Sequence, residues 1–521
     1  MHLSNHLLFI DDLKLFATDE KVLETMVSET INFMNTVGLE TNREKSATNS
    51  SNCSSEAKLL EDTEGYKYLG VFEDSKSRIT NETLSKIKDE LAARIRRLCK
   101  SRLNAKNLIK AINEHAISLV NYYVGLLKLE PEDYRDIDSE IRKILSEEQV
   151  HLQPACMERL YLPREELGRG LHCVEHRSEQ MLLQLHNTLD ASKEISTRRA
   201  AILKVEYDCK THLSVIVPYL KTKYGMKDIL TKKNLEEAQT AALYGDISKK
   251  IRHEKLYRAR NNEIVNMKDS SMWLKRGNIR PQDEARYCYL QDRNMFGGSD
   301  AMCPHCNTQR KTVEHLATQC EKMLYHDYMR RHNEVLRCIH LLLCNKYGVK
   351  STKRMGSHSV QEIVANENVE IRVDTRIRTS IKLAADRPDI FILDKRRREI
   401  VLIEVGITSQ DRLQTVETEK TRKYDLLANK LGLEYKCKTR IIPYVMTWDG
   451  VVTKHHRRYV NEIGLTEAIE AYIHTIVLKK TLESISFEHR RAADDGDCPV
   501  ENLHQVNRPR RHEVTAVKVQ E

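Results

Sequence analysis

Hydrophobic positions along the chain predict short strands near both ends and long helices between them. The runs IFIL at 390–393 and IVLIEV at 400–405 are apolar and rich in β-branched residues, which is typical of buried strands in a hairpin. Residues 82–129 instead place hydrophobic side chains three and four positions apart, which predicts an amphipathic helical region. Near the N-terminus, LLFI and LKLFA bracket two aspartates, which predicts a strand, a turn and a strand. We therefore expect a mixed fold, mostly α with α+β parts.

Charged side chains gather around the predicted C-terminal hairpin. Asp389 opens its first strand and Glu404 lies near the end of its second, so both carboxylates can reach the same end of a sheet. A helix-like segment with Lys420, Lys423 and Tyr424 follows. This set suits a Mg²⁺ site for phosphodiester cleavage, because carboxylate oxygens hold the metal, the metal generates hydroxide and a lysine steadies charge on the phosphate. The alternative is a strand with a surface aspartate and an ordinary glutamate.

The order of these residues resembles the restriction-like PD-(D/E)xK nuclease fold, an α/β domain. RPD, then a strand that carries Glu404, then a lysine and a tyrosine on a helix is most similar to the version at the C-terminus of site-specific non-LTR retrotransposon polyproteins. The resemblance covers residues 380–450, including the later strand RIIPYVMTWDG. Gly406 occupies the position where the fold usually has its lysine. In the retrotransposon branch the next helix supplies that lysine, which implies Lys420 or Lys423 here.

The N-terminal hairpin presents Asp11 and Asp12 at its tip, where two carboxylates form a natural divalent-metal site. An Asp-Asp turn alone is common, but its surroundings resemble the second half of a reverse-transcriptase palm. FIDD is similar to the catalytic F/Y-x-D-D hairpin, NREKS with Lys45 to the N-x-x-K-S element, and YLG at 68–70 to the primer-grip hairpin. Lys86, Arg94 and further basic residues then decorate the helical region, which the resemblance identifies as a thumb.

Only ten residues precede Asp11. We therefore expect the third metal-binding carboxylate of such polymerases, and their fingers, to be missing. The resemblance then implies an RNA-directed DNA polymerase by family that is inactive in this chain. The apolar palm face that would meet the missing strands should be exposed, so we also expect a sticky or partly disordered N-terminus.

A cluster of potential metal ligands lies in the segment CPHCNTQRKTVEHLATQC. Cys303 and Cys306 form a Cys-x2-Cys pair, and His315 and Cys320 follow after eight and four residues. Three thiolates and one imidazole suit tetrahedral zinc, and a site filled by four protein ligands is structural. The alternative is a set of free cysteines near the surface. We predict a structural Zn²⁺ knuckle with His305 outside the ligand set, followed by a basic helix that resembles the same retrotransposon family through its RHN triplet.

Two groups of basic residues are candidates for contacts with nucleic-acid backbones. Lysine and arginine contacts of this kind are independent of sequence and sensitive to salt. The alternative is a solvated helix face, which charge runs usually form. The candidate residues are Arg94, Arg96, Arg97 and Lys100 in the predicted thumb, and Arg330 and Arg331 after the knuckle.

The composition favours a nucleic-acid partner and a reducing compartment. The chain has 521 residues and a net charge of +9, which favours a polyanionic partner. Its thirteen cysteines follow no disulfide-like spacing, which favours a reducing, intracellular compartment. No apolar run approaches the ~20 residues that a membrane span needs, so we expect no membrane partner. With DNA and RNA as partners, we expect a nuclear location.

The predicted domains are residues 1–78, the palm piece; 79–180, a helical thumb; 181–298, a helical linker; 299–345, the zinc knuckle and basic helix; 346–482, the nuclease; and 483–521, a disordered tail. The leading hypothesis is a fragment of a non-LTR retrotransposon reverse transcriptase/endonuclease that retains Mg²⁺-dependent DNA nicking and pairs with a full-length element polyprotein. The first alternative is a non-enzymatic nucleic-acid-binding relic of such an element. The second is a zinc-dependent interaction module.

Overall fold

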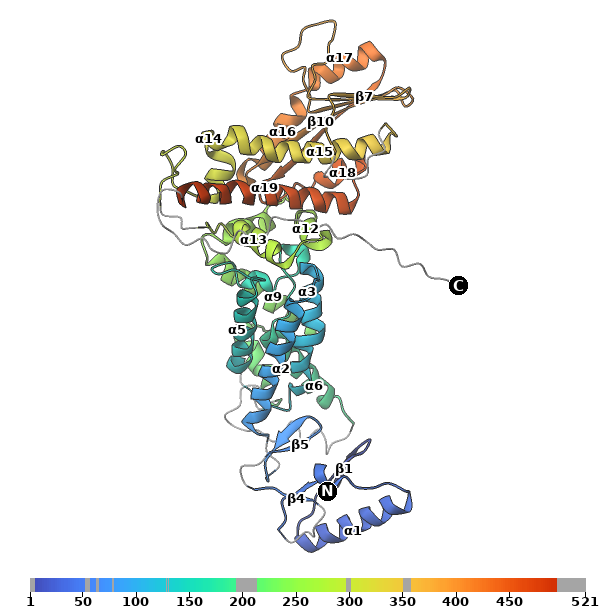
Figure 1. Cartoon of the computed structure of the whole chain (residues 1–521), viewed down its shortest axis with the longest axis vertical. Coiled ribbons are helices and arrows are strands. Elements are labelled where there is room, and N and C mark those ends of the chain that lie inside the picture. The colour runs from blue at the N-terminus through green and yellow to red at the C-terminus, as the bar shows by residue number, and fades with distance from the viewer. Residues whose placement is uncertain are drawn as a thin grey trace.

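The computed structural model describes residues 5–51, 57–61, 65–76, 79–127, 129, 131–193, 213–296, 301–349 and 358–493. The described chain is mixed and mostly helical, as the hydrophobic pattern predicts. Figure 1 shows an elongated arrangement in which small N-terminal strands lie at one end, a bundle of helices in the middle and the large sheet at the other end. After the sheet, the last described helix, α19 (Glu467–Ala493), returns to the helices in the middle.

The N-terminal hairpin is present as the sequence predicts. β1 (His6–Phe9) and β2 (Asp12–Leu15) are antiparallel, with Phe9 opposite Asp12. Asp11 lies in the turn, where Ile10 has a φ of 57° and is 84% exposed. Leu7, Leu8 and Phe9 are also exposed, which agrees with the expected exposure of apolar side chains here. Residues 1–4 lie outside the described part of the chain.

The other small elements at this end also follow the sequence pattern. Asp19 caps α1 by accepting a hydrogen bond from the Val22 backbone N–H at 3.0 Å. Leu69 and Gly70 both have positive φ and form the turn of the predicted hairpin at YLG. The elements are α1 (Glu20–Thr36), a 3₁₀ turn (Arg43–Lys45), β3 (Ala47–Thr48), β4 (Lys58–Leu59), β5 (Tyr66–Tyr68) and β6 (Val71–Glu73).

A helical bundle follows and forms a core of its own. Ile87, Leu91 and Ile95 are buried on one side of its first helix, at the three- and four-residue spacing read from the sequence. They pack against residues of the later helices such as Ile141. The helices are α2 (Asn81–Cys99), α3 (Ala105–Ala111), a π-helical turn (Ile112–Ile117), α4 (Ser118–Tyr123) and α5 (Pro131–Glu147).

Buried ion pairs join the loop after the bundle to a distant helix. Arg159 pairs with Asp292 at 3.0 Å, and both side chains are almost completely buried. Arg164 and Arg169 each bind Glu284 at 2.9 Å, and burial opposes these paired charges while the arginines hold the pKa of Glu284 below its usual value. The helices of this region are α6 (Val174–Asp190), α8 (Ile216–Tyr224), α9 (Lys232–Ser248), α10 (Glu254–Tyr257), α11 (Met267–Ser270), α12 (Met272–Arg276) and α13 (Pro281–Gln291).

The large sheet has five strands in the order β11-β10-β9-β8-β7. β10 pairs with β9 in antiparallel register and with β11 in parallel register. Both runs that the sequence identified as buried strands, and the later strand at RIIPYVMTWDG, are therefore confirmed. The strands are β7 (Ile363–Ala365), β8 (Val369–Val373), β9 (Ile390–Asp394), β10 (Glu399–Thr408) and β11 (Lys438–Thr447).

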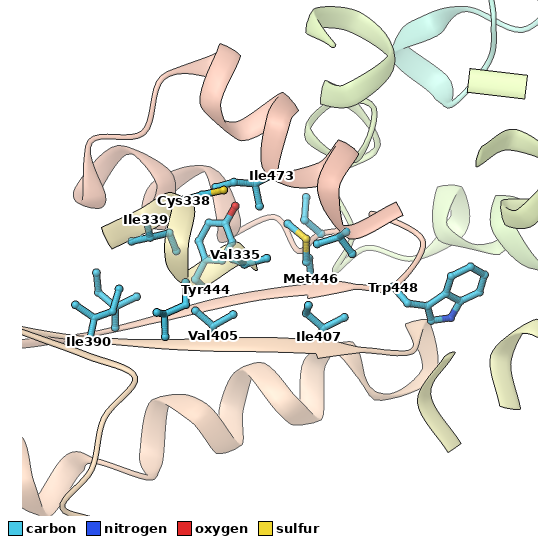
Figure 2. Packing of buried hydrophobic residues seen from close by; sticks show 14 of the residues in the cluster. Val335, Cys338, Ile339, Ile390, Val405, Ile407, Tyr444, Met446, Trp448 and Ile473 are labelled. Carbon is cyan, nitrogen blue, oxygen red and sulfur yellow. The ribbon is translucent and has the colours of Figure 1, made fainter. Parts of the chain in front are cut away.

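Alternating side chains of the sheet enter two different cores. Val405 and Ile407 of β10 pack toward Val335 and Ile473, as Figure 2 shows, and Ile403 belongs to the same core. The intervening side chains of β10 and β9 pack toward α17. The first face is covered by α15 (Met329–Lys346) and α19 (Glu467–Ala493); the second by α16 (Leu413–Arg422) and α17 (Asp425–Tyr435).

Three predicted domain boundaries fall inside helices. The boundary at 180 lies within α6, the boundary at 345 within α15 and the boundary at 482 within α19. Knuckle residues and sheet residues also share one hydrophobic core. The predicted knuckle and nuclease are therefore parts of one packed unit. The predicted disordered tail begins too early, because α19 continues to Ala493; its remainder, 494–521, lies outside the described residues.

Candidate nuclease and metal sites

The pairing of β9 with β10 brings the two predicted carboxylates together. Ile403 lies opposite Ile390, so the next pair of positions in this antiparallel register is Glu404 and Asp389. Neighbouring side chains alternate between the two faces of a strand. Since Ile403 points toward α15, Glu404 faces α16 and α17. Asp389 lies just before β9, close enough to Glu404 for a side-chain hydrogen bond, and also contacts His332 of α15. The predicted convergence of these carboxylates is therefore observed.

Each carboxylate has its own set of hydrogen-bond donors. Oδ2 of Asp389 accepts from the Val405 backbone N–H at 2.8 Å and lies 3.1 Å from Nε2 of His332. Glu404 forms ion pairs with Lys423 at 2.7 Å and with Lys420 at 3.4 Å. Glu404 is 1% exposed, so its charge depends on these partners rather than on water.

The two carboxylates have opposite pKa shifts. Burial and the neighbouring Asp389 together raise the pKa of Glu404 to about 7, against the opposing effects of Lys420 and Lys423. Burial also acts to raise the pKa of Asp389, but the hydrogen bonds from His332 and from Glu404 outweigh it and hold that pKa well below its usual range. The two carboxylates thus titrate as a coupled pair that shares one proton near neutral pH.

This shared proton makes metal binding dependent on pH. A carboxylate must lose its proton to bind a cation. The pKa of Glu404 is higher in the folded chain than in the unfolded chain. The folded state therefore gains stability from the protonated Glu404 at low pH. This gain is lost as the pH rises from the pKa of the unfolded chain to about 7. Above that pH, a divalent cation held by both carboxylates would stabilise the ionised form of Glu404.

We therefore expect Mg²⁺ to raise the melting temperature more at about pH 8 than at about pH 5.5. A metal at ten times its Kd contributes about 1.4 kcal/mol, or about 1 °C for a chain of this size. Thermal unfolding at both pH values measures the difference. Glu404→Gln is the control, because its neutral amide should remove the dependence on Mg²⁺. An equal Mg²⁺ effect in Glu404→Gln would contradict this prediction.

The three predicted residues after Glu404 occupy different environments. Lys420 lies in the last turn of α16, while Lys423 and Tyr424 lie where α16 ends and α17 begins, not at the centre of one helix as the sequence suggested. Both lysines reach Glu404, so the structure leaves both in the candidate site. Tyr424 is buried and donates its hydroxyl to the Arg387 carbonyl at 2.6 Å. Its catalytic role stays a prediction; in this structure its hydroxyl holds the segment before Asp389 in place.

The predicted zinc ligands form a compact group. Their ligand atoms all lie within 4.8 Å of one another, and a metal ion such as zinc would fit between them. Sγ of Cys303 and Sγ of Cys320 are 3.8 Å apart, which matches about 3.8 Å for two thiolates on tetrahedral zinc with 2.3 Å bonds. Sγ of Cys306 lies 3.3 Å from Nε2 of His315. The predicted Cys₃His set is thus brought together; His305 is outside it.

Local structure and charge prepare this site for a cation. The first two ligands lie in a turn in which the Asn307 N–H binds the Cys303 carbonyl and Asn307 has a φ of 53°. The hydroxyl and the backbone N–H of Thr308 lower the pKa of Cys306 to about 5, so its thiolate is available at neutral pH. His315 and Cys320 bracket one π-helical turn, in which the Cys320 N–H binds the His315 carbonyl at 2.7 Å.

A second buried group, His456, Glu470 and His474, also has three potential metal ligands. Oε1 of Glu470 lies 2.6 Å from Nε2 of His456 and 3.0 Å from Nε2 of His474, and Tyr444 donates to Oε2 at 2.8 Å. Burial opposes ionisation of Glu470, but both histidines outweigh it and lower its pKa. Because these distances are those of hydrogen bonds, we interpret the group as a hydrogen-bonded network of the core.

The predicted nucleic-acid contacts meet different outcomes. Arg94 and Arg97 share Glu90, and Arg96 pairs with Glu147, all at the surface of the bundle. These surface pairs are weak, so the arginines stay available to phosphates. Lys100 is exposed, and so is Lys45 of the polymerase-like element. Arg330 is half-buried and pairs with Glu483 at 3.2 Å.

The structure does not place Arg331 on a surface that could contact nucleic acid. Its side chain is 1% exposed and donates to the Ala317 carbonyl. A buried guanidinium in this position does not face a nucleic-acid backbone. The run of basic residues suggested a surface, but the helix that carries it packs between the knuckle and the sheet.

The sequence interpretation also missed His332. Its Nε2 is the side-chain partner of Asp389, although the two are 57 positions apart. The RHN triplet drew attention to this position only as part of a basic helix, and no local spacing connects it with the carboxylates.

A scan against models of known protein families finds no match, and a search of curated proteins finds no similar sequence. Among the described helices, none combines the length and the apolar character required to cross a bilayer.

Proposed function

We propose that the chain is a Mg²⁺-dependent DNA endonuclease of the restriction-like type. The observation that carries this proposal is the convergence of Asp389 and Glu404 at one end of the sheet, with Lys420 and Lys423 on Glu404. Two carboxylate groups that share one proton near neutral pH suit a divalent cation, because the cation replaces the proton. The donors available are oxygens, which Mg²⁺ prefers.

The residues of the chain have distinct parts in the proposed reaction. Asp389 and Glu404 would hold Mg²⁺, which, when bound, supplies the charge that activates water and stabilises the phosphate. The lysines neutralise Glu404 in the absence of a cation. With Glu404 engaged by a cation, an ammonium group from Lys420 or Lys423 is free to bind a phosphate oxygen, which orients the scissile bond.

The wider architecture is the basis for proposing a retrotransposon origin. The N-terminal aspartate hairpin, the YLG hairpin, the helical bundle and the Cys₃His knuckle occur in the order expected for a non-LTR reverse transcriptase/endonuclease. In such a protein the substrates are DNA and RNA, the place of action is the nucleus and the full-length element polyprotein is a natural partner. The zinc in this proposal is structural, because the protein fills all four ligand positions.

Nicking of supercoiled plasmid tests the proposed function. We expect the purified chain to convert supercoiled DNA to the open circular form with Mg²⁺, and to stop when a chelator removes the metal. Ca²⁺ should support DNA binding with little nicking, because the larger ion takes looser geometry. Glu404→Gln, purified in parallel, reports any contaminating nuclease.

The same assay decides between this function and a non-enzymatic nucleic-acid-binding relic. DNA binding that falls steeply with salt, without Mg²⁺-dependent nicking, would contradict the nuclease and favour the relic. The polymerase-like hairpin makes RNA a second ligand to include in the binding measurement.

A further inference from the structure

Helix α15 connects the metal knuckle with the candidate nuclease site through two adjacent residues. Arg331 and His332 are both buried, at 1% and 7% exposure. Arg331 donates to the Ala317 carbonyl, which lies between the knuckle ligands His315 and Cys320. His332 reaches Asp389 with its Nε2. One helical turn therefore contacts both sites.

The contacts of Asp389 indicate what His332 does. His332 and the Val405 backbone N–H both bind Oδ2 of Asp389, at 3.1 and 2.8 Å. Two donors on one oxygen fix the rotation of the carboxylate. The imidazole ring is itself held by stacking on Tyr328, at 6.1 Å between ring centroids and 26° between planes. Hydrogen bonds of this kind orient metal-binding carboxylates in proteins.

His332 is not placed as a metal ligand. The ring nitrogen of His332 that faces the site, Nε2, lies at hydrogen-bond distance from Oδ2 of Asp389, 3.1 Å. Its Nε2 therefore acts on Asp389 rather than on a shared cation. Arg331 is also excluded from nucleic-acid contact by its burial.

We propose that His332 is a positioning residue that orients Asp389, and that the knuckle holds His332 in place through the bond from Arg331 to Ala317. The proposal rests on the proposed nuclease function. It gives the knuckle a role inside the protein: an intact knuckle keeps α15 in the position from which His332 reaches the carboxylate. Zinc and the nuclease cation then support each other through one helix.

Two variants of His332 separate hydrogen bonding from shape. His332→Phe keeps a ring against Tyr328 but cannot donate a hydrogen bond, whereas His332→Gln retains a donor near the position of Nε2. We expect the Phe variant to bind Mn²⁺, a probe for Mg²⁺, about 10–100-fold more weakly, as loss of such an orienting partner usually does. The kcat for nicking should fall similarly with KM for DNA unchanged, and His332→Gln should recover most of both. Mn²⁺ binding is measured by electron paramagnetic resonance, independently of activity.

The anchor is tested with Arg331→Met, which preserves length and loses the donor. We expect it to retain zinc and to bind Mn²⁺ several-fold more weakly than the wild type. Wild-type Mn²⁺ affinity and kcat in His332→Phe, or a Gln variant as weak as the Phe variant, would overturn the positioning role. Unchanged Mn²⁺ affinity in a zinc-containing Arg331→Met would overturn the anchor.

The outcomes also separate this inference from the proposed function. Equal Mn²⁺ binding by the wild type and by Asp389→Ala would contradict the proposed nuclease site, and the inference would fail with it. Binding that depends on Asp389 but not on His332 would overturn only the inference. Melting temperature and zinc content, measured for each variant, identify a variant that fails to fold, and His332→Gln then decides the role of the donor.

Discussion

Replacing Asp389 by alanine is expected to abolish Mg²⁺-dependent nicking, with a loss of about 10³-fold or more. Removal of one of two metal-binding carboxylates costs several kcal/mol of transition-state stabilisation, which corresponds to this factor. DNA binding should persist, because backbone contacts come from basic side chains elsewhere. The fold should also persist, since Asp389 precedes β9 and its side chain is not part of either hydrophobic core. Single-turnover nicking and a gel-shift titration measure the two effects.

Asp411→Ala is the matched control. Asp411 is an exposed aspartate of the same domain, before α16, and does not belong to the carboxylate pair. It should nick at the wild-type rate. Nicking by Asp389→Ala at a rate close to that of Asp411→Ala would show that the cleavage chemistry resides elsewhere.

The purified, reduced chain is expected to contain about one Zn²⁺, and Cys306→Ser is expected to lose it. Zinc binding by such small sites supplies about 10–16 kcal/mol of apparent folding free energy, so the knuckle should unfold without the ion. The effect should spread, because knuckle residues share a core with the sheet. We expect the melting temperature to fall by more than about 5 °C. Metal analysis by mass spectrometry and thermal unfolding measure both changes.

Two control variants define the ligand set. His305→Ala lies inside the same turn but outside the group of four, and Cys437→Ser removes a thiol that binds only the Tyr435 carbonyl. Both should keep the ion. Absence of zinc from the wild-type protein would contradict the predicted zinc knuckle. A zinc ion retained in Cys306→Ser would instead direct attention to His456, Glu470 and His474 as a second metal site.

The sequence was sufficient where the chemistry lies in local patterns. Asp389 and Glu404 could be predicted because one hairpin and a two-residue period decide which side chains meet. The four knuckle ligands could be predicted because they lie within one short segment. The exposed apolar residues of the N-terminal hairpin were expected for another reason, the resemblance to a palm whose remaining strands are missing.

The sequence was insufficient where distant segments decide the environment. His332 meets Asp389 because α15 packs on the sheet, and Arg331 is buried for the same reason. The sequence of a basic helix looks the same whether a given side chain faces solvent or packs against the knuckle. The domain boundaries were misplaced because α6, α15 and α19 continue through them, while composition changes nearby. Helix continuity depends on packing, which no window of sequence contains.

The buried arginine pairs that join the loop after the bundle to α13 also constrain the order in which the chain can fold. Arg159 and Asp292 are 133 positions apart, and Arg164 and Glu284 are 120 apart. The core around them includes Cys156 and Leu478. During synthesis on a ribosome, Arg159 and Arg164 therefore stay charged and unpaired until most of the chain has been made. Contacts between such distant positions form slowly, so the middle of this molecule should be the last part to close during synthesis.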